Sequence, residues 1–375
     1  MSQFILTASI IAAELLLFIP LWNLFSTPVL SKYPISNLKK LDSLPKVTIM
    51  VPMRNEAHNI IQTLPKILNL NYPNFEVILV DDNSTDDTYE LCQSIIGPHA
   101  QRNKVRLIKG KKLPDGWMGK QWALHQGAKH ATGELYLFLD ADVFVTKNAL
   151  LKLLAAKIKE NVDLMSFFTQ QIKISFGERL LVPLVNWGLL SFLPLWLTNN
   201  DNSSFFAVAQ GQCVLVTKKA YFSVGGHECV RSAILDDAQL AIEFKKKGFN
   251  ILIGTAKEVI NCRMYRSLKE SFMGFSKNTF TATKVHWSVF LFLYTVIFII
   301  SLLAYIGPFF SLMFLPLTFW VVLQQLIFWR LAGEDFWFNI IFYPVQITLF
   351  YVVGLHSFFY SVFSKVEWKG REYKL

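Results

Sequence analysis

Val80-Asp81-Asp82-Asn83-Ser84-Thr85-Asp86 and Phe138-Leu139-Asp140-Ala141-Asp142 are the two stretches that decide the fold. Each stretch follows an apolar run, and each run ends in carboxylates. In an open α/β sheet, ligands bind outside the carboxyl ends of the strands. An Asp-X-Asp at such a strand end supplies the oxygen ligands that a hard divalent cation prefers. The two stretches therefore predict a nucleotide–metal site at one edge of a sheet.

Strands and helices are expected to alternate around these two stretches. The expected strands are residues 47–51 (closed by Pro52), 76–80, 105–108 and 134–139. The expected helices run from Asn55-Glu56 toward Leu70, from Ser84–Asp87 onward, through Ala123–Ala128, and from Asp236 to Lys247-Gly248. Ser, Thr and Asp are favourable N-cap residues, and Gly commonly ends a helix. The alternation favours the α/β class, with a mixed, mostly parallel sheet flanked by helices.

The composition of the chain predicts a membrane protein. Of its 375 residues, 53% are hydrophobic, 17% are charged and 33 are Phe, which is too apolar for a purely soluble enzyme. The net charge of +10 favours contact with an anionic lipid face. No long Lys/Arg run or nucleic-acid module occurs in the sequence, so no nucleic-acid partner is expected. The four cysteines form no CxxC pair and are expected to be reduced and structural.

The first apolar segment, Phe4 to Phe25, is long enough to span a bilayer, and residues 1–28 are expected to form an N-terminal transmembrane anchor. No basic residue precedes the segment, and several lysines follow it: Lys32, Lys39, Lys40 and Lys46. The positive-inside rule then places the N-terminus outside and the next domain in the cytoplasm. A cleaved signal peptide is the alternative, but its basic n-region is missing. Glu14 is expected to pair with a polar group on another helix.

A second apolar stretch, residues 178–197, has two interpretations. A single membrane crossing here would put Asp140 and Asp236 on opposite sides of the bilayer, and Pro183 and Pro194 weaken a straight span. We therefore expect an interfacial helix or hairpin on the cytoplasmic leaflet. It would belong to a cytoplasmic domain that covers residues 45–282.

Three further apolar segments, Ser288–Phe310, Ser311–Trp329 and Phe338–Phe363, predict C-terminal membrane helices within residues 287–363. A basic tail, residues 364–375, follows them. If all three segments cross, this tail lies outside, which conflicts with the positive-inside rule. A re-entrant segment, for example the one with Pro316, is the alternative.

Three pairs of acids, here called the acidic stations, are candidates for chemistry: Asp81/Asp82, Asp140/Asp142 and Asp236/Asp237. Glycosyl transfer from a nucleotide diphosphate sugar requires that the nucleoside is held and that charge on the leaving diphosphate is neutralised by a metal. An acceptor hydroxyl must also lose its proton to a carboxylate. The stations suit these roles in that order, and Lys120 after Gly119 is placed to touch a phosphate.

Each station alone has a simpler interpretation. The first station can be only a turn and a helix cap. The second has the Asp-X-Asp pattern that many loops contain, and the third can be the solvent-exposed start of a helix. Their order and strand-end placement together are more specific. His227, after Gly225-Gly226, either approaches the acceptor or stabilises a turn, and His125 is expected on a helix surface.

The sequence resembles membrane-bound glycosyltransferases of family 2, which have a GT-A fold, over about residues 45 to 280. The resemblance rests on the acidic stations, Gly119-Lys120, Val224-Gly225-Gly226 and Val51-Pro52-Met53-Arg54-Asn55-Glu56. It implies a cytoplasmic nucleotide-sugar site and inversion at the anomeric carbon. The implied nucleotide-sugar residues are Pro52, Arg54, Glu56, Asp81, Asp82, Lys120 and Asp140. It also implies a divalent cation, Mg or Mn, held by Asp142 and Asp140, and a catalytic base at Asp237, with Asp236 as substitute.

Two further segments bear on the substrate. Phe272–Asn278 lacks the Gln/Arg-x-x-Arg-Trp motif of processive members, which favours a single-transfer enzyme. Loop Gly116–Leu124 and tail Val366–Tyr373 resemble the bacterial subgroup acting on carotenoid acids, and the loop also resembles hopanoid-associated members. The resemblance implies a UDP-sugar donor, with glucose first, and a membrane lipid acceptor such as the carotenoid acid 4,4'-diaponeurosporenoate.

The acceptor has alternatives. A carotenoid carboxyl group is already ionised at pH 7 and needs no base, so a hydroxylated lipid of hopanoid, diacylglycerol or ceramide type fits the third station equally well. Polyprenyl phosphate would need a basic pocket, for which Arg263, Arg266 and Lys269 are candidates, although lipid head groups also explain them. A membrane protein that keeps the fold without activity is disfavoured, because every acidic station is intact.

Overall fold

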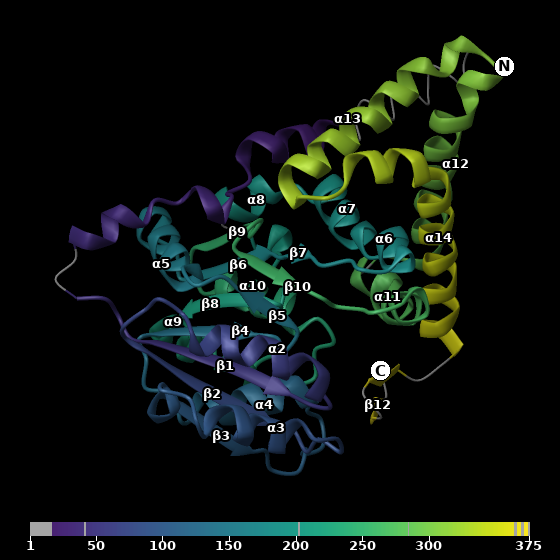
Figure 1. Cartoon of the computed structure of the whole chain (residues 1–375). Helices are drawn as coiled ribbons and strands as arrows, with labels where there is room; N and C mark the ends of the chain where they lie inside the picture. Colours follow the sequence, from purple (N-terminus) through teal and green to yellow (C-terminus); the bar gives the residue numbers. More distant parts are fainter. Residues whose placement is uncertain are drawn as a thin grey trace. The chain divides into compact units, whose positions relative to one another are not determined.

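The computed structural model describes residues 17–40, 43–201, 203–283, 285–363, 366–368 and 371–373. The chain forms two compact units, whose elements are labelled in Figure 1. The sheet unit comprises Thr27–Gln170 and Leu195–Cys262. The helical unit comprises Gln171–Pro194, the part of the chain from Arg263 onward, and the N-terminal segment up to Ser26. Most of the expected anchor at residues 1–28, including Glu14, lies outside the described residues.

A seven-stranded sheet organises the sheet unit, in the order β3-β2-β1-β4-β8-β6-β9. Strand β8 is antiparallel to both neighbours, and the other pairs are parallel. The sheet is therefore mixed and mostly parallel, as predicted. The seven strands are β1 (Val47–Met53), β2 (Phe75–Asp81), β3 (Val105–Lys109), β4 (Leu135–Leu139), β6 (Leu164–Phe168), β8 (Cys213–Thr217) and β9 (Ile251–Thr255). The short strands are β5 (Val143–Val145), β7 (Gln170–Gln171) and β10 (Ile260–Cys262).

Helices pack on this sheet, and their positions follow the sequence pattern closely. They are α2 (Ala57–Leu68), α3 (Thr88–Ile96), α4 (Gly119–Ala128), α5 (Ala149–Glu160), α8 (Leu195–Asn200), α9 (Lys218–Ser223) and α10 (Asp236–Lys246). Apolar side chains of β1, β2, β4 and β8 form one core with those of α4 and α10. Strands buried on both faces are typical of parallel sheets, which explains their continuous apolar runs.

Two predicted boundaries were wrong. Strand β1 continues through Pro52, which lies in register with Val80 of β2. Helix α3 begins at Thr88 and not at Ser84. The reason is that side chains of the intervening loop bond across to the loop after β1: Ser84 Oγ accepts the Asn55 N–H, and Asp86 Oδ2 accepts the Ala57 N–H.

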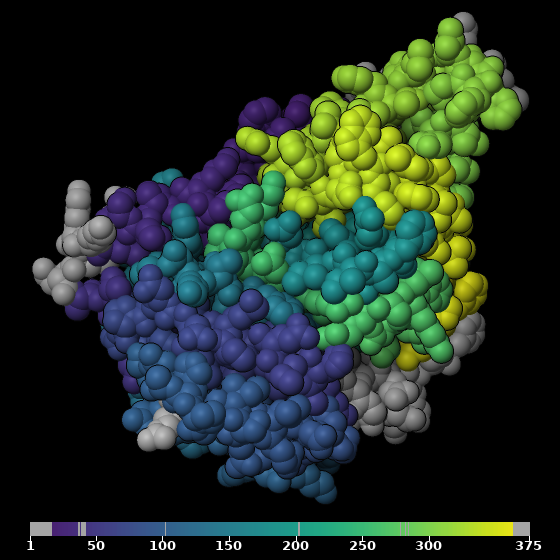
Figure 2. Space-filling model, in the orientation of Figure 1, coloured from purple at the N-terminus to yellow at the C-terminus, as the bar shows by residue number. Residues whose placement is uncertain are grey.

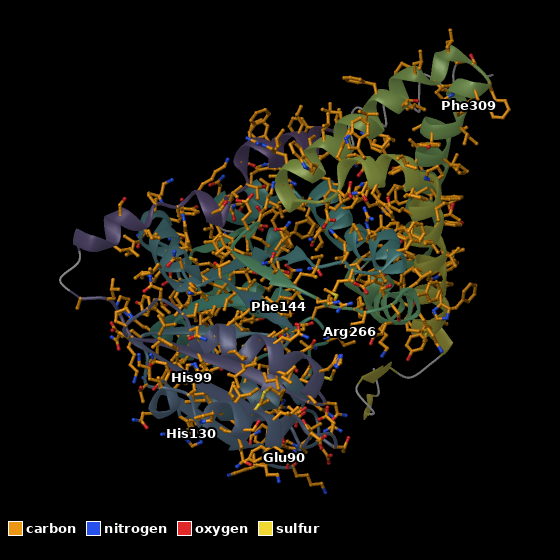
Figure 3. All side chains as sticks on the ribbon, viewed as in Figure 1. Glu90, His99, His130, Phe144, Arg266 and Phe309 are labelled. Carbon is orange, nitrogen blue, oxygen red and sulfur yellow. The ribbon has the colours of Figure 1, made fainter. Side chains whose placement is uncertain are left out.

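The helical unit contains the apolar segments of the C-terminal half. Its helices are α6 (Phe176–Leu181), α7 (Pro183–Phe192), α11 (Leu268–Thr283), α12 (Trp287–Ile306), α13 (Leu315–Ala332) and α14 (Phe336–Phe363). Three segments are long and apolar enough to cross a membrane: Trp287–Phe309, Leu312–Ala332 and Phe336–Val362. Their side chains (green to yellow in Figure 2) pack against one another, and Phe309, 85% exposed, projects beyond the turn between α12 and α13 (Figure 3).

The apolar stretch at residues 178–197 is not one continuous helix. It forms α6 and α7, which meet at Val182-Pro183, and the start of α8. Within α6, the buried Glu178 carboxylate accepts hydrogen bonds from Arg263 Nη2 (3.0 Å) and the Ile174 N–H (2.8 Å). Arg263 is thus an ion-pair partner within the helical unit.

One carboxylate, Glu76, ties three segments together at the edge of the sheet where β1 begins. Its oxygens accept from Thr48 Oγ1 (2.6 Å) and the Thr132 N–H (2.7 Å), and they pair with Lys46 Nζ (2.9 Å). Burial opposes the charge of this group, but the hydrogen bonds outweigh it and lower the pKa of Glu76 to about 2.

We expect Glu76→Gln to reduce the stability of the protein by about 2 kcal/mol at neutral pH, because it weakens hydrogen bonds to a charged group. The folded-state pKa lies below the unfolded one, so the contribution is complete above the unfolded pKa of 4.5 and is lost as the pH falls toward 2. Thermal unfolding in detergent should show a difference from wild type that shrinks below about pH 4.5. Glu134→Gln is the control, since Glu134 is exposed and accepts only a long bond from Lys46 N–H (3.2 Å). An equal effect of both variants would contradict the assignment.

Candidate active site

The loops after β1 and β2 interlock at the carboxyl ends of these strands. Arg54 Nη1 donates to the carbonyl oxygens of Asp82 (2.7 Å) and Asn83 (2.8 Å), and the Thr85 N–H donates to Asn55 Oδ1 (2.8 Å). Asn55 and Asn83 both have positive φ, 54° and 55°, a conformation that Asn tolerates better than most residues. Arg54, Glu56 and Asp82, which are predicted nucleotide-sugar residues, thus lie on a fixed pair of loops.

The first acidic station is buried between these loops. Asp81 is 1% exposed and Asp82 is 2% exposed. Asp81 Oδ2 accepts the Ser84 N–H, whereas Oδ1 has no hydrogen-bond partner within the described ranges. The backbone of Asp81 lies close to Gly110. A Cβ on Gly110 would lie only 2.7 Å from the carbonyl oxygen of Asp81. A buried acceptor without a donor is costly, so Asp81 is suited to receive an N–H from a ligand.

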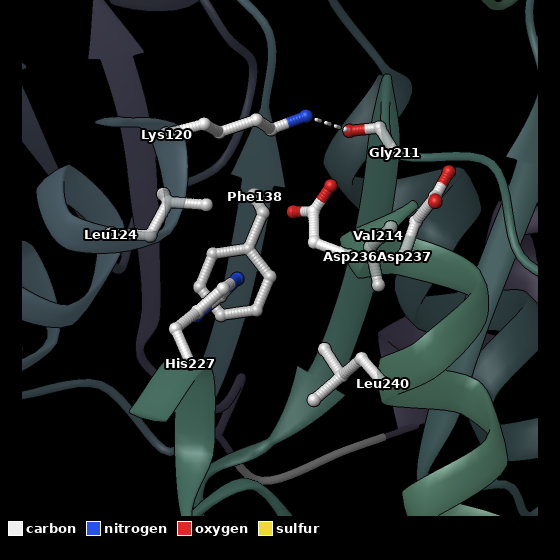
Figure 4. Close-up of a pocket in the computed structure, with 9 residues that line it drawn as sticks. All are labelled: Lys120, Leu124, Phe138, Gly211, Val214, His227, Asp236, Asp237 and Leu240. Carbon is white, nitrogen blue, oxygen red and sulfur yellow. Dashed lines mark hydrogen bonds between the residues drawn. The ribbon is translucent and has the colours of Figure 1, made fainter. Parts of the chain in front are cut away.

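Lys120 and the third acidic station meet at one pocket (Figure 4). Lys120 from the start of α4, Asp236 and Asp237 from the start of α10, and Gly211 before β8 line it. Lys120 Nζ lies 2.6 Å from Asp140 Oδ1, directly after β4, and donates to the Gly211 carbonyl at 3.3 Å. The structure therefore brings the third station together with Lys120 and with one acid of the second.

The charges in this pocket shift one another's ionisation. Burial and then the Asp236 charge raise the pKa of Asp237 to about 6, against the opposing effect of Lys120. Burial also raises the pKa of Asp236, although Lys120 opposes this shift. Burial alone would lower the pKa of Lys120, but Asp140 and Asp236 outweigh it and hold that pKa above its usual value. Lys120 is thus charged at neutral pH. The pKa of Asp237 lies slightly below neutral pH.

The second station, Asp140 and Asp142, supplies two carboxylates that could hold a divalent cation. Asp142 precedes β5, which pairs with β10 so that Val143 lies opposite the buried Cys262. No cluster of three His, Cys, Asp or Glu side chains suited to a metal exists in the part of the chain that the structure describes. Mg²⁺, however, is usually held by one or two carboxylates together with substrate phosphates and water. The donor set of Asp140 and Asp142 fits a cation that binds together with a diphosphate.

Sequence reasoning missed two parts of this site. Gly211 leaves little room for a side chain, because a Cβ would lie 3.0 Å from Lys120 Nζ and 3.2 Å from Asp237 Oδ2, and these groups would have to shift. The only signal for it is a Gly between two Gln just before an apolar strand. Gln121 Nε2 donates to the carbonyl of Ala233 (2.7 Å) and ties α4 to the loop before Asp236. Nothing in the sequence distinguishes Gln121 from a surface residue.

A mixed, mostly parallel sheet with acidic residues after β2 and β4 defines a GT-A glycosyltransferase, and comparisons with known proteins agree. Residues 48–210 match the family described as glycosyl transferase family 2. The 4,4'-diaponeurosporenoate glycosyltransferase of Staphylococcus aureus (strain USA300) is 24% identical over 352 residues, covering 88% of each chain. A mannosyltransferase from Pyrobaculum calidifontis, solved in complex with GDP-Man and Mn²⁺, has the same fold, with a TM-score of 0.53 and 17% identity over 96% of this chain and 99% of its own. The chain is therefore a glycosyltransferase whose residues 48–210 match the family 2 model, as the motifs predicted.

We expect Gly211→Ala to lower kcat between about tenfold and a hundredfold, because displacing a reacting group by a fraction of an ångström is costly in catalysis. The added Cβ would push against Lys120 Nζ and Asp237 Oδ2. Gly188→Ala is the control, since its nearest neighbour would be Phe350 Cζ at 4.0 Å. Steady-state transfer rates of the purified variants, with thermal unfolding as a folding check, make the measurement. Full activity of Gly211→Ala would show that the spacing of Lys120 and Asp237 is unimportant.

Proposed function

We propose that the chain transfers a hexose, with glucose first, from a UDP-sugar to a membrane lipid with inversion at the anomeric carbon. The leading acceptor is a carotenoid acid such as 4,4'-diaponeurosporenoate. One observation carries the proposal: Lys120 and the Asp236-Asp237 pair line a single pocket, and Lys120 is ion-paired with Asp140. The S. aureus relative, whose name specifies that carotenoid acid, supports the choice of acceptor.

The donor binds across the ends of β1, β2 and β4 in this proposal. Asp81 accepts an N–H of the base, and its unpartnered Oδ1 supports this role. Pro52, Arg54, Glu56 and Asp82 enclose the same site, Asp140 faces the ribose, and Lys120 touches a phosphate. The Pyrobaculum mannosyltransferase binds GDP-Man, which is also a nucleotide diphosphate sugar. The identity of the base, uracil here, rests on the family resemblance.

Asp142 and Asp140 hold a divalent cation, Mg or Mn, in the proposed site. The cation neutralises charge on the leaving diphosphate when bound. Two carboxylates in an Asp-X-Asp turn support this assignment, as does the Mn²⁺ of the Pyrobaculum enzyme. The Lys120 ammonium lies 2.6 Å from Asp140 Oδ1 and partly balances the carboxylate charge.

Asp237 is the proposed base, and Asp236 is its substitute. A general base works best when its pKa is close to the working pH, and the pKa of Asp237, about 6, is suitably raised. The acceptor oxygen would displace the diphosphate in a single step, with its proton passing to Asp237.

This role favours a hydroxylated lipid of hopanoid, diacylglycerol or ceramide type as the second candidate acceptor, since a carboxylate brings no proton. Polyprenyl phosphate is less favoured, because Arg263 is already paired with Glu178.

The proposed location is the cell membrane, with several spans and the catalytic domain in the cytoplasm. Three helices of suitable length and hydropathy support membrane spans. Lysines at positions 32 and 46 support the cytoplasmic side for the domain that follows the N-terminal segment. The bounds 45–282 for that domain and 287–363 for the membrane helices remain part of the proposal.

Expression in a host that makes the carotenoid acid tests the acceptor. We expect mass spectrometry of lipid extracts to show a hexose-sized gain on the carotenoid, which Asp142→Asn abolishes. The exposed Asp115→Asn is the matched control and should leave the product unchanged. A hexose on another lipid would move the acceptor to the second candidate. No new glycolipid, with the protein present in the membrane, would contradict the proposed function.

The pH dependence of transfer tests the base. For a hydroxyl acceptor, the rate should fall as the pH drops through about 6, because protonation of Asp237 removes the base. For a carboxylate acceptor, the rate should persist until the acceptor itself is protonated near a pKa of about 4 to 5. Rate profiles of wild type and Asp237→Asn between pH 5 and pH 8 make the comparison. A hydroxyl acceptor with an unchanged profile in Asp237→Asn would assign the base to another residue.

A further inference from the structure

His227 enters the pocket from a turn that only glycines can form. Gly225 and Gly226 both have positive φ, 93° and 59°. A Cβ on Gly226 would lie 2.8 Å from the Tyr221 ring, so the chain can fold back over Tyr221 only with Gly there. The imidazole then packs edge-on against Phe138, with ring centroids 4.7 Å apart, and is 2% exposed.

Tyr221 fixes the hydrogen on this imidazole. The Tyr221 hydroxyl oxygen accepts the backbone N–H of His227 (3.1 Å) and lies 2.8 Å from Nδ1 of the same residue. Nδ1 is the one acceptor found for the hydroxyl hydrogen within the described segments, so the hydroxyl donates to Nδ1. Nδ1 is then unprotonated, and the hydrogen of the neutral ring is on Nε2. Burial and then the Lys120 charge lower the pKa of His227 to about 3, so the ring stays neutral at working pH.

The N–H on Nε2 has no acceptor among the residues that the structure describes, since the hydrogen bonds of His227 involve only Nδ1 and the backbone. The side chain is nevertheless one of those that line the pocket, and its outer end points into the space beside Asp236 (Figure 4). An Nε2 hydrogen that faces the pocket without a protein acceptor is available to a ligand oxygen.

We propose that His227 donates a hydrogen bond from Nε2 to the oxygen-bearing group of the acceptor and so helps to select and orient it beside Asp236 and Asp237. The inference rests on the proposed function, which supplies the acceptor. The ligand group is a hydroxyl or carboxylate oxygen, because an N–H donor recognises both. The base and ribose of the donor are assigned to the loops after β1, β2 and β4, so loss of His227 should act more strongly on the acceptor than on the donor.

Two substitutions separate the hydrogen bond from the packing of the ring. Gln places its amide N–H₂ near the position of Nε2, whereas Asn reaches only the position of Nδ1. We expect His227→Asn to raise the acceptor KM about tenfold, the cost of one lost hydrogen bond of about 1.4 kcal/mol. His227→Gln should recover most of that loss. The donor KM should change much less than the acceptor KM in both variants.

His125→Phe is the matched control, because His125 stacks on Trp122 and does not line the pocket. The assay uses the full-length protein in detergent with the acceptor that mass spectrometry identifies. Equal acceptor KM values for wild type, Asn and Gln variants would overturn the inference. A parallel rise in donor and acceptor KM would also overturn it, since it would show a structural role. Absence of transfer by the wild-type protein would instead reject the proposed function, and the inference with it.

Discussion

The ion pair between Lys120 and Asp140 is the interaction on which the rest of the site depends. Lys120 places a positive charge between Asp140 and the Asp236-Asp237 pair, in surroundings with little water. Charges in such surroundings interact more strongly than in bulk water, and an unbalanced group would be costly to bury. Removal of Lys120 would raise the pKa of Asp237 further, because Lys120 is the charge that opposes the shift. In the proposed mechanism, the same residue thus keeps one acid next to the donor and leaves another usable as a base.

The antiparallel strand β8 is what brings these groups together. Its pairing with β4 sets Leu139 opposite Cys213, and the Asp140 N–H donates to the Gln212 carbonyl (3.2 Å). The residue after β4 is therefore adjacent to the residue before β8, and Gly211 comes within reach of Lys120. A parallel strand in this position would place its preceding loop at the opposite edge of the sheet. One reversed strand in a mostly parallel sheet thus supplies the backbone carbonyl that positions the lysine.

The sequence predicted those parts of the site that depend on one strand end at a time. Asp81 and Asp140 directly follow apolar runs that could only be buried strands, so their place at the sheet edge could be inferred. Gly211 and Tyr221 could not, because their roles depend on the register of β8 and on contacts between distant segments. The start of α3 was missed for a similar reason: Asp86 binds the backbone of Ala57, and a local N-cap pattern does not reveal such a bond.

The start of α10 explains how two neighbouring acids can share the pocket. Unpaired N–H groups in the first turn of a helix favour negative charge, and the Ala238 N–H donates to Asp237 Oδ1 (2.8 Å). This bond lowers the pKa of Asp237, whereas burial and Asp236 raise it, and the result lies near 6. Without the hydrogen bond from the helix terminus, the pKa of Asp237 would lie higher, and without burial it would lie lower. A carboxylate acceptor would add a further negative charge beside this pair, whereas a hydroxyl would not. The negative charges at the start of α10 therefore weaken the binding of a carotenoid acid. Other contacts with the carotenoid must offset this electrostatic cost.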